Sequence, residues 1–454
     1  METVVVYSAY SNNRLSYVLD WLLKERLQLT YSITDNEAEA QQATNCICYG
    51  KQLDNKISIP DASLLQYNTV NALHTTDAAI HEGKGLQKVT PVMGVWENLP
   101  VLFAQNEQGY TLPFDLLSAI FYLLSRYEEY LCTDYDKHGR FPATASILYK
   151  EGLLTRPIVD EWIEAFRQLL IKVWDTPIQQ HPFTFQPSYD IDMAYSHAYK
   201  GIGRIAGAYI RALLKGDVAQ INERTQVLKK KVTDPYDSFA WLRHQHEQYG
   251  YKPLYFILCA LRTTAFDKNI HPKHPAMIRV IKQLAKEGNI AIHPSYYATH
   301  YDVLAKEKNV LKNLTGQTIN LSRQHYIRLM IPVTYQLLMD NEIHEDYSMG
   351  YGTHTGFRAG TGSSFLWYDL LQERVAPIRT HPFCFMDTTA HYELGLTPEQ
   401  SFFELRKMER ILKHTGSTMI TVFHNFSLGT DKEWDGWNTA YQSFLAEMSN
   451  RHSA

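Results

Sequence analysis

The stretch Pro187-Ser188-Tyr189-Asp190-Ile191-Asp192 is the most informative part of this sequence. It ends an apolar, strand-like segment that begins near Phe183, so two carboxylates stand at the end of one strand. In α/β proteins the carboxyl ends of the strands open onto the ligand crevice. A pair of acidic side chains at that position is suited to metal binding and to proton transfer.

Two further segments end in a similar way. Residues 290–293 read Ile-Ala-Ile-His and residues 420–424 read Ile-Thr-Val-Phe-His, so a histidine closes each apolar run. One polar residue at a strand end means little, because buried strands also end in polar residues by chance. Three such ends in one chain favour a common mouth that gathers Asp, His and His.

The chain after residue 180 alternates between strand-like and helix-like segments. Gly250 and Gly288 end two of the helices, and Thr397-Pro398-Glu399-Gln400 is a capping box that starts the last long one. Strands are expected at residues 254–259, 289–293, 315–321, 347–351, 378–385 and 418–423, besides the one that ends at Asp192. The predicted fold class is α/β, an incomplete (β/α) barrel of about seven strands over residues 181–454, with parallel pairing and right-handed crossovers.

Residues 1–180 are predicted to form a smaller, accessory α/β module. Val4–Tyr7 is strand-like, and apolar stripes predict one helix over residues 116–127 and another that begins at Pro157. The segment 177–182 is polar and bounded by prolines, so we take it as the domain boundary.

Composition argues against several classes of protein. The 454 residues, 45% of them apolar, suffice for two or three domains with their own cores. With 44 basic and 48 acidic side chains, the formal net charge is −4, and no dense basic stripe suggests a nucleic-acid partner. The five cysteines lack CxxC spacing and are expected to be reduced, buried thiols.

The sequence shows no pattern for export or for membrane insertion. Its first residues lack a basic segment, a long apolar core and a cleavage site. The most apolar helix-like stretch, 116–124, is far shorter than the roughly twenty residues that a bilayer-spanning helix needs. We therefore expect a cytoplasmic protein without a transmembrane segment.

Residues 181–429 resemble the polysaccharide deacetylase domain, also called carbohydrate esterase family 4 or NodB-like, in a divergent bacterial branch with its own N-terminal module. Asp190-Ile191-Asp192 is similar to the first motif of that family. The resemblance implies that Asp190 is the catalytic base and Asp192 a ligand of a divalent metal, with zinc as the expected ion. Such an ion polarises an acetamide carbonyl and activates water, while a nearby carboxylate accepts the proton.

The second motif of the family has two metal-binding histidines four residues apart, and this chain departs from it. His293 ends a strand-like run, but the residue four positions later is Tyr297. Either a third ligand comes from elsewhere, or the metal site is weak or lost. We favour His325 as the ligand, because it lies in a loop before the helix opened by Pro332, and such loops face the catalytic mouth. His300 is the competitor, and a solvated loop histidine is the plain alternative.

The later motifs of the family are better matched. Gly356-Phe357-Arg358-Ala359-Gly360 resembles the arginine motif, which implies that Arg358 orients Asp190. Asp387 resembles the acid that holds this arginine, and His424 resembles the histidine that protonates the leaving amine. Further residues expected to line the substrate cleft are Arg323, Tyr296, Phe365 and Trp367, although the aromatic ones could equally pack inside the barrel.

The resemblance implies a metal-dependent hydrolase that acts on a carbon–nitrogen bond and removes N-acetyl groups from a glycan or a glycan precursor. An N-acetylated carbohydrate is then the expected partner, and a cytoplasmic location favours a precursor or a lipid-linked intermediate. The departure at Tyr297 motivates an alternative, a catalytically silent carbohydrate-binding or assembly protein on the same barrel. O-deacetylation, or hydrolysis of a different amide, is a third possibility, because the metal chemistry does not choose the acyl acceptor.

Overall fold

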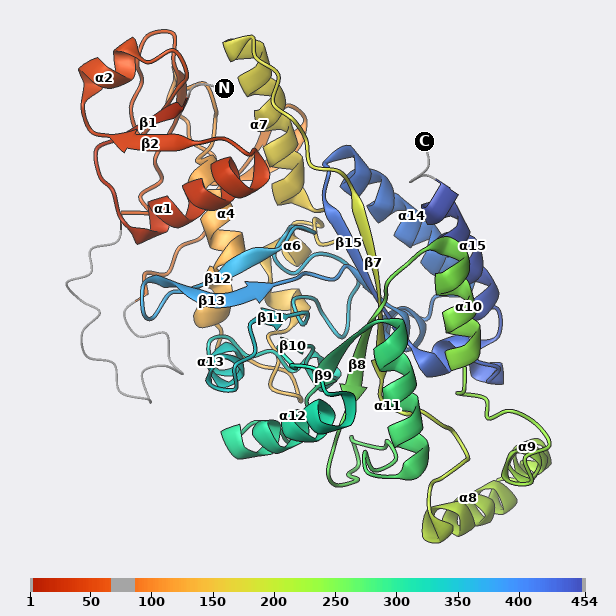
Figure 1. Cartoon of the computed structure of the whole chain (residues 1–454). Helices are drawn as coiled ribbons and strands as arrows, with labels where there is room; N and C mark the ends of the chain where they lie inside the picture. Colours follow the sequence, from red (N-terminus) through yellow and green to blue (C-terminus); the bar gives the residue numbers. More distant parts are fainter. Residues whose placement is uncertain (1–2, 67–85, 451–454) are drawn as a thin grey trace.

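A nine-stranded, curled sheet is the centre of the computed structural model, which describes residues 3–66 and 86–450 (Figure 1). Every neighbouring pair is parallel except the pair at one edge, which is antiparallel. The strands, in the order in which they lie side by side, are β12 (Phe365–Asp369), β13 (Arg374–Thr380), β11 (Glu345–Asp346), β10 (Leu321–Ser322), β9 (Asn289–His293), β8 (Leu254–Leu258), β7 (Thr184–Ile191), β15 (Thr418–His424) and β14 (Phe385–Met386). The two edge strands, β12 and β14, are not paired with each other, so the predicted incomplete (β/α) barrel is confirmed, with nine strands.

Helices connect these strands and lie around the outside of the sheet (Figure 1). They are α10 (Phe239–Tyr249), α11 (Pro275–Glu287), α12 (Tyr301–Thr315), α13 (Val333–Asp340), α14 (Pro398–His414) and α15 (Trp437–Asn450). The predicted capping box is present: Thr397 accepts from the backbone of Gln400, and Gln400 accepts from the backbone of Thr397. Gly250 ends α10 in the left-handed region, where glycine carries no steric penalty. Short turns of 3-10 helix or π-helix also follow several strands: η4 (His325–Ile327), η5 (Thr389–Glu393), η6 (Asn425–Leu428) and η7 (Lys432–Trp434).

Three predicted strands were wrong in their limits. Residues 315–321 are not one strand, because α12 continues to Thr315, Gly316 ends it at φ +72°, and only Leu321 and Ser322 pair. The predicted strand 347–351 is a loop, and the paired residues lie just before it, in β11. The predicted strand 378–385 is divided between β13 and β14, which lie at opposite ends of the sheet.

The N-terminal part begins with a parallel sheet of the order β2-β1-β3-β4, formed by β1 (Val4–Ser8), β2 (Tyr31–Thr34), β3 (Cys46–Tyr49) and β4 (Ile57–Ile59). Its remaining elements are α1 (Asn13–Leu19), η1 (Asp20–Arg26), α2 (Glu37–Gln42), the hairpin strands β5 (Met93–Trp96) and β6 (Leu99–Leu102), α4 (Leu116–Leu124), α5 (Tyr127–Tyr130), η3 (Ala143–Ala145), α6 (Ile147–Lys150) and α7 (Ile158–Trp174). One hydrophobic cluster runs through this part and into the barrel. The boundary at residues 177–182 stays a prediction.

Buried polar contacts also join the N-terminal part to the barrel. Arg14 of α1 binds both carboxylate oxygens of Glu373, at 2.9 and 2.5 Å, and all these groups are buried. Asp160 of α7 accepts hydrogen bonds from the hydroxyl of Thr361 and the backbone of Gly362. Because buried charges are stable only with partners, these pairs fix how the two parts meet.

A helical pair that the sequence did not predict lies between β7 and α10. Its helices are α8 (Ile202–Leu214) and α9 (Val218–Leu228), and Figure 1 shows them projecting from the body of the molecule at the lower right. Within the described ranges, no helix is both long and apolar enough to cross a bilayer.

Candidate metal centre and active site

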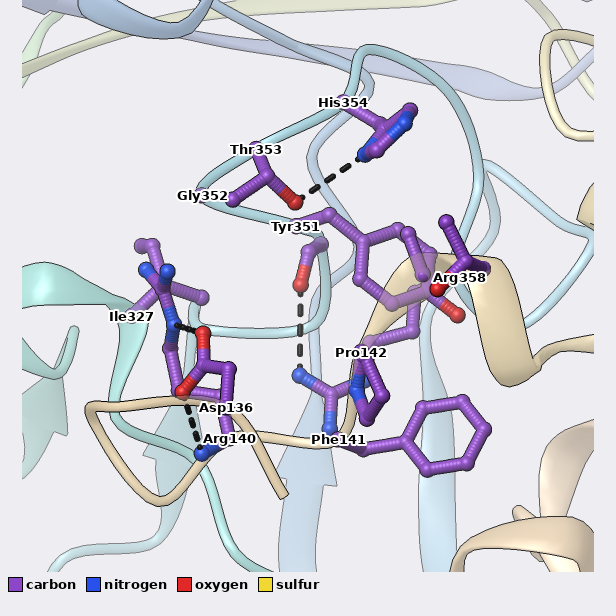
Figure 2. Close-up of a pocket in the computed structure, with 13 residues that line it drawn as sticks. Asp136, Arg140, Phe141, Pro142, Ile327, Tyr351, Gly352, Thr353, His354 and Arg358 are labelled. Atoms are coloured by element: carbon purple, nitrogen blue, oxygen red, sulfur yellow. Dashed lines mark hydrogen bonds and ion pairs between the residues drawn. The ribbon is translucent and has the colours of Figure 1, made fainter. Parts of the chain in front are cut away.

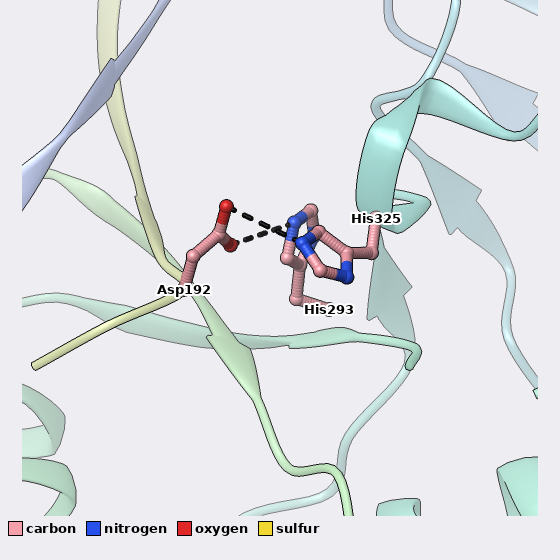
Figure 3. Close-up of side chains that lie close together, drawn as sticks. All are labelled: Asp192, His293 and His325. Carbon is pink, nitrogen blue, oxygen red and sulfur yellow. Dashed lines mark ion pairs between the residues drawn. The ribbon is translucent and has the colours of Figure 1, made fainter. Parts of the chain in front are cut away.

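Three of the predicted ligands meet where the strands of the barrel end (Figure 3). Asp192 follows β7, His293 is the last residue of β9, and His325 begins the turn after β10. Nε2 of His293 lies 3.1 Å from Oδ1 of Asp192, and Nε2 of His325 lies 3.4 Å from Oδ2. The three ligand atoms lie within 4.8 Å of one another, as a shared ion would require.

The hydrogen bonds of the two histidines turn the same ring nitrogen toward Asp192. Nδ1 of His293 donates to the backbone carbonyl of Arg323 at 2.5 Å, and Nδ1 of His325 donates to Asp267 at 3.1 Å. Each Nε2 is therefore free to bind an ion. In metal-binding histidines, the other ring nitrogen usually donates a hydrogen bond in this way. Oδ1 of Asp192 is buried and makes no hydrogen bond within the described residues. Two imidazoles and a carboxylate fit a zinc-type ion that keeps an open position.

The protonation states of Asp192, His293 and His325, called the cluster below, depend on one another. Burial alone would lower the pKa of His325, but Asp192 and Asp267 outweigh it and raise this pKa to about 9. Burial opposes the charge on Asp192 as well, yet the two imidazoles hold its pKa well below the usual value. Without an ion, a proton on His325 thus balances the carboxylates, and a bound ion would displace that proton.

Asp190 stands beside this cluster and is held by Arg323. Nη1 of Arg323 donates to Oδ1 of Asp190 at 2.8 Å, and Nη2 donates to the Ser188 hydroxyl at 2.8 Å. The guanidinium is fully buried and lies over the ring of Phe256, with its central carbon 4.0 Å from the centroid. Oδ2 of Asp190 faces His293, 3.7 Å from Nε2. Arg323 is therefore a positioning residue behind the site. We had predicted that it lines the substrate cleft, and that prediction was wrong, because its side chain is buried and absent from the wall of the cleft.

Arg358 does not orient Asp190, so that prediction was wrong. Its Nε and Nη2 atoms bind Glu129 of α5 at 2.8 and 2.6 Å, and this buried carboxylate neutralises the guanidinium. Figure 2 shows Arg358 and Tyr351 in the wall of a pocket. This pocket has a volume of about 240 Å³ and shares Asp136 and Arg140 with the cleft that contains Asp190. The GFRAG motif thus contacts the N-terminal part, and the guanidinium beside Asp190 belongs to Arg323, which directly follows β10.

Asp387 and His424 form a buried pair on the other side of Asp192. Oδ1 of Asp387 accepts from Nδ1 of His424 at 2.6 Å, and Oδ2 accepts from the backbone of His424 at 2.7 Å. The hydroxyl of Ser427 also donates to Asp387. Asp387 therefore holds the histidine, whereas the resemblance had implied that it holds an arginine. Nε2 of His424 points at the cluster, 3.4 Å from Oδ2 of Asp192.

The environment of His424 favours its protonated form. Burial lowers the pKa of the imidazole, but the carboxylates of Asp387 and Asp192 outweigh burial and raise the pKa well above its usual value. An imidazole that carries a proton at neutral pH, with the free nitrogen aimed into the site, is suited to act as a general acid.

These groups open into a cleft of about 630 Å³. Besides Asp190, the cluster and His424, its wall holds aromatic and thioether side chains that the sequence did not single out: Met193, Phe266, Tyr326, Met386, Tyr392 and Phe426. A further part of the wall comes from the N-terminal region, in Asp136, Lys137, His138 and Arg140. Apolar and aromatic side chains with a few polar groups among them are typical of a cleft that binds a small molecule.

The aromatic residues predicted for the cleft lie elsewhere. Phe365 and Trp367 are fully buried in β12, where Trp367 packs on Tyr335 with a centroid distance of 5.2 Å. Tyr296 stacks on Phe266 at 3.9 Å and stands behind it, in the wall of a smaller cavity. Side chains along a strand point alternately to its two faces, so the sequence does not show which face meets the cleft. It also did not show that β12 lies at the edge of the sheet, next to α4.

Tyr297 and His300 take no part in the cluster. Tyr297 is exposed, and His300 is exposed at the start of α12. Of the two histidines considered as a third ligand, His325 is the one that the structure places beside Asp192 and His293.

The turn that carries His325 is held by the N-terminal loop 136–140. Tyr326 and Ile327 have φ values of +59° and +51°, which are strained for residues with a Cβ. Nη1 of Arg140 donates to the carbonyl of Tyr326 at 2.7 Å, and Asp136 binds the same guanidinium at 2.7 Å. The sequence Asp136-Lys137-His138-Gly139-Arg140 is unusually rich in charge, which is the signal that could have drawn attention to it.

Comparisons with known proteins concern two different parts of the chain. Residues 4–175 match the model of a family of unknown function, DUF7033. No curated protein matches the sequence. Among solved structures, the chain is similar to a protein from Mycobacterium smegmatis assigned as a polysaccharide deacetylase, with 13% identity, a TM-score of 0.38, and coverage of 59% of this chain and 84% of that one.

Two further solved structures cover similar shares. The PuuE allantoinase has 10% identity and a TM-score of 0.38, with 59% of this chain and 84% of that chain covered. A polysaccharide deacetylase from Bacillus cereus has 10% identity and a TM-score of 0.29, with 58% and 88% covered. At such values, function has to come from the residues of the site themselves.

Proposed function

We propose that this protein is a metal-dependent hydrolase that removes an N-acetyl group from a glycan or a glycan precursor. The observation that carries the proposal is the arrangement around Asp192, His293 and His325. A carboxylate fixed by an arginine stands on one side of this candidate ion site, and an imidazole fixed by a carboxylate stands on the other. Hydrolysis of an amide needs a base for water and an acid for the amine, and both are present.

Asp190 is the proposed base. Arg323 holds Oδ1, so the free Oδ2 stays directed toward the cluster, where it can accept a proton from the attacking water. The ion pair with Arg323 also fixes the direction in which this carboxylate points. This assignment keeps the role of Asp190 that the motif implies and gives its support to Arg323.

His424 is the proposed acid. Asp387 fixes the ring through Nδ1, so Nε2 can deliver its proton to the nitrogen of the departing amine. Because the bond broken is a carbon–nitrogen bond, the amine leaves only when it is protonated. A bound divalent ion would polarise the acetamide carbonyl and lower the pKa of the attacking water.

The shape of the cleft supports a carbohydrate as the substrate. Phe266, Tyr326 and Phe426 offer ring faces next to the reacting groups. The alternative of a catalytically silent protein was motivated by Tyr297, and the position of His325 beside Asp192 supports the catalytic proposal instead. The same groups could also hydrolyse an acetyl ester. Comparing N-acetylated with O-acetylated substrates distinguishes the two reactions.

Acetate release from a panel of N-acetylated oligosaccharides, with zinc in excess, tests the proposal. Asp190→Asn should retain zinc yet lose turnover by a factor of about a hundred or more, because the amide cannot accept the proton. His300→Ala is the matched control and should behave as the wild type, since this histidine is exposed and outside the cluster. Equal release by wild type and Asp190→Asn, or no release from the panel by zinc-loaded wild type, would refute the proposal.

A further inference from the structure

The helical pair α8–α9 is inserted on the same side of the barrel as the cleft. It follows the loop after β7, whose carboxyl end carries Asp190 and Asp192. Arg204 of α8 donates to the backbone carbonyl of Lys268 at 3.0 Å, and Lys268 lines the cleft. Figure 1 shows the pair extending away from the body, so most of its surface contacts no other described part of the chain.

One face of α8 is apolar and open to solvent. Positions 202, 206, 210, 213 and 214 share a face, because spacings of three and four residues return to the same side of a helix. The exposed fractions of the large apolar side chains here and at the start of α9 are 89% for Ile202, 58% for Ile210, 65% for Leu213, 84% for Leu214 and 73% for Val218. Single exposed apolar residues are common in soluble proteins, but a continuous stripe of them marks an interaction surface.

This stripe is not the face that holds the two helices together. Ala212 and Val227 are buried between the helices, and the hydroxyl groups of Tyr209 and Thr225 are 2.8 Å apart. Arg224 lies over the ring of Tyr209. The two helices thus pack through a different side of α8, and the apolar stripe stays exposed to solvent.

The rest of the hairpin surface is basic. Arg204, Arg211 and Lys215 recur at spacings of seven and four residues and form another face of α8, and Lys229-Lys230-Lys231 follow α9. Residues 200–231 hold eight basic and two acidic side chains, although the whole chain has a formal net charge of −4. The positive charge is therefore concentrated where the apolar stripe is exposed.

We propose that the α8–α9 hairpin docks the protein on the surface of an anionic lipid bilayer. An apolar stripe flanked by lysine and arginine is the pattern of a helix that lies in the interface, with its apolar side in the acyl chains and its cations at the headgroups. A nucleic acid would leave the apolar stripe in water. Docking through this hairpin brings the cleft near the membrane plane. The proposal is independent of the reaction at the site.

Flotation of the full chain with vesicles tests the docking. The protein should float with vesicles of phosphatidylcholine mixed with phosphatidylglycerol, remain unbound with pure phosphatidylcholine, and dissociate as salt is raised, because salt screens the charges. Ile210→Ser/Leu214→Ser should reduce the bound fraction at least about tenfold, because the apolar contact is lost.

The matched control is Val92→Ser/Val95→Ser, which removes two exposed apolar side chains outside the hairpin and should bind like the wild type. An unchanged circular dichroism spectrum in every variant shows that the chain is folded. Absence of wild-type protein from the anionic vesicles would overturn the proposal. So would sedimentation of the lipid-free wild type as a dimer that Ile210→Ser/Leu214→Ser abolishes, because a second copy would then cover the stripe.

Discussion

Asp190 has one oxygen held by Arg323 and the other directed at the histidine cluster. The guanidinium of Arg323 also donates to the Ser188 hydroxyl and to the carbonyl of Tyr347, and it lies over the ring of Phe256. A base that is fixed in this way does not have to be reoriented during the reaction. We infer that the geometry of Arg323, in addition to its charge, sets the activity of Asp190.

Arg323→Lys should therefore lower turnover about tenfold to a hundredfold while zinc affinity stays unchanged. Lysine keeps the charge but cannot reach Asp190 and Ser188 together. Steady-state kinetics and zinc titration are the measurements. Arg358→Lys is the comparison, because that side chain binds Glu129 and should affect stability far more than turnover. A larger loss of turnover in Arg358→Lys than in Arg323→Lys would contradict the assignment.

The raised pKa of His325 predicts that zinc binding releases a proton. The metal-free imidazole has a pKa of about 9 and is protonated at neutral pH, so the proton must leave before Nε2 can bind the ion. Zinc affinity should rise with pH until about pH 9 and then level off. Calorimetry at pH 7.5 in buffers of different ionisation enthalpy measures the release, which should amount to about one proton. Binding without any proton release would show that His325 is not a ligand.

The sequence indicated Asp190, Asp192, His293 and His424 because each ends a buried strand, and strand ends share one side of a parallel sheet. The prediction that Arg358 orients Asp190 failed, because a motif gives the residue types but does not show which partner each side chain contacts. Glu129 lies far away in the sequence and satisfies Arg358. No local pattern contains that information.

The turn η4 is held in a strained conformation from outside the barrel. Tyr326 and Ile327 have positive φ, and Arg140 binds the carbonyl between them. Arg328 at the end of the turn donates to the carbonyl of His138 at 3.0 Å. The loop 136–140 thus holds the turn that carries His325.

Arg140→Gln should weaken zinc binding about tenfold to a hundredfold, which is the usual effect of losing a group that positions a ligand. Competition with a chromophoric chelator measures the affinity. Arg156→Gln removes a half-exposed ion pair with Glu161 in the same region and serves as the control. Equal zinc affinity in both variants would mean that the loop plays no part in holding His325.

Elements with strong local signals were predicted with nearly correct limits. Helix α14 has a capping box, α10 ends at a glycine, and β8 is fully apolar. The two-residue strands β10 and β11 were misplaced, because so short a strand is defined by its neighbours in the sheet and has no pattern of its own. The helices α8 and α9 were not predicted, although α8 carries apolar residues at helical spacing.

The molecule as a whole joins an N-terminal part and a half-barrel through a common core. Composition and length indicated two regions, and the alternation of strands and helices indicated the barrel. That residues 136–140 of the first region form a wall of the cleft follows from long-range packing, for which the sequence carries no periodic signal. The N-terminal part is thus built into the site.

The ion content of the protein, purified without chelator and then supplied with zinc, is the decisive measurement. Elemental analysis should find about one divalent ion per chain in the wild type and in His300→Ala. Asp192→Ala, His293→Ala and His325→Ala should each lose the ion while remaining folded by circular dichroism. Full occupancy in these three variants, or no ion in the wild type with zinc in excess, would contradict a metal centre formed by Asp192, His293 and His325.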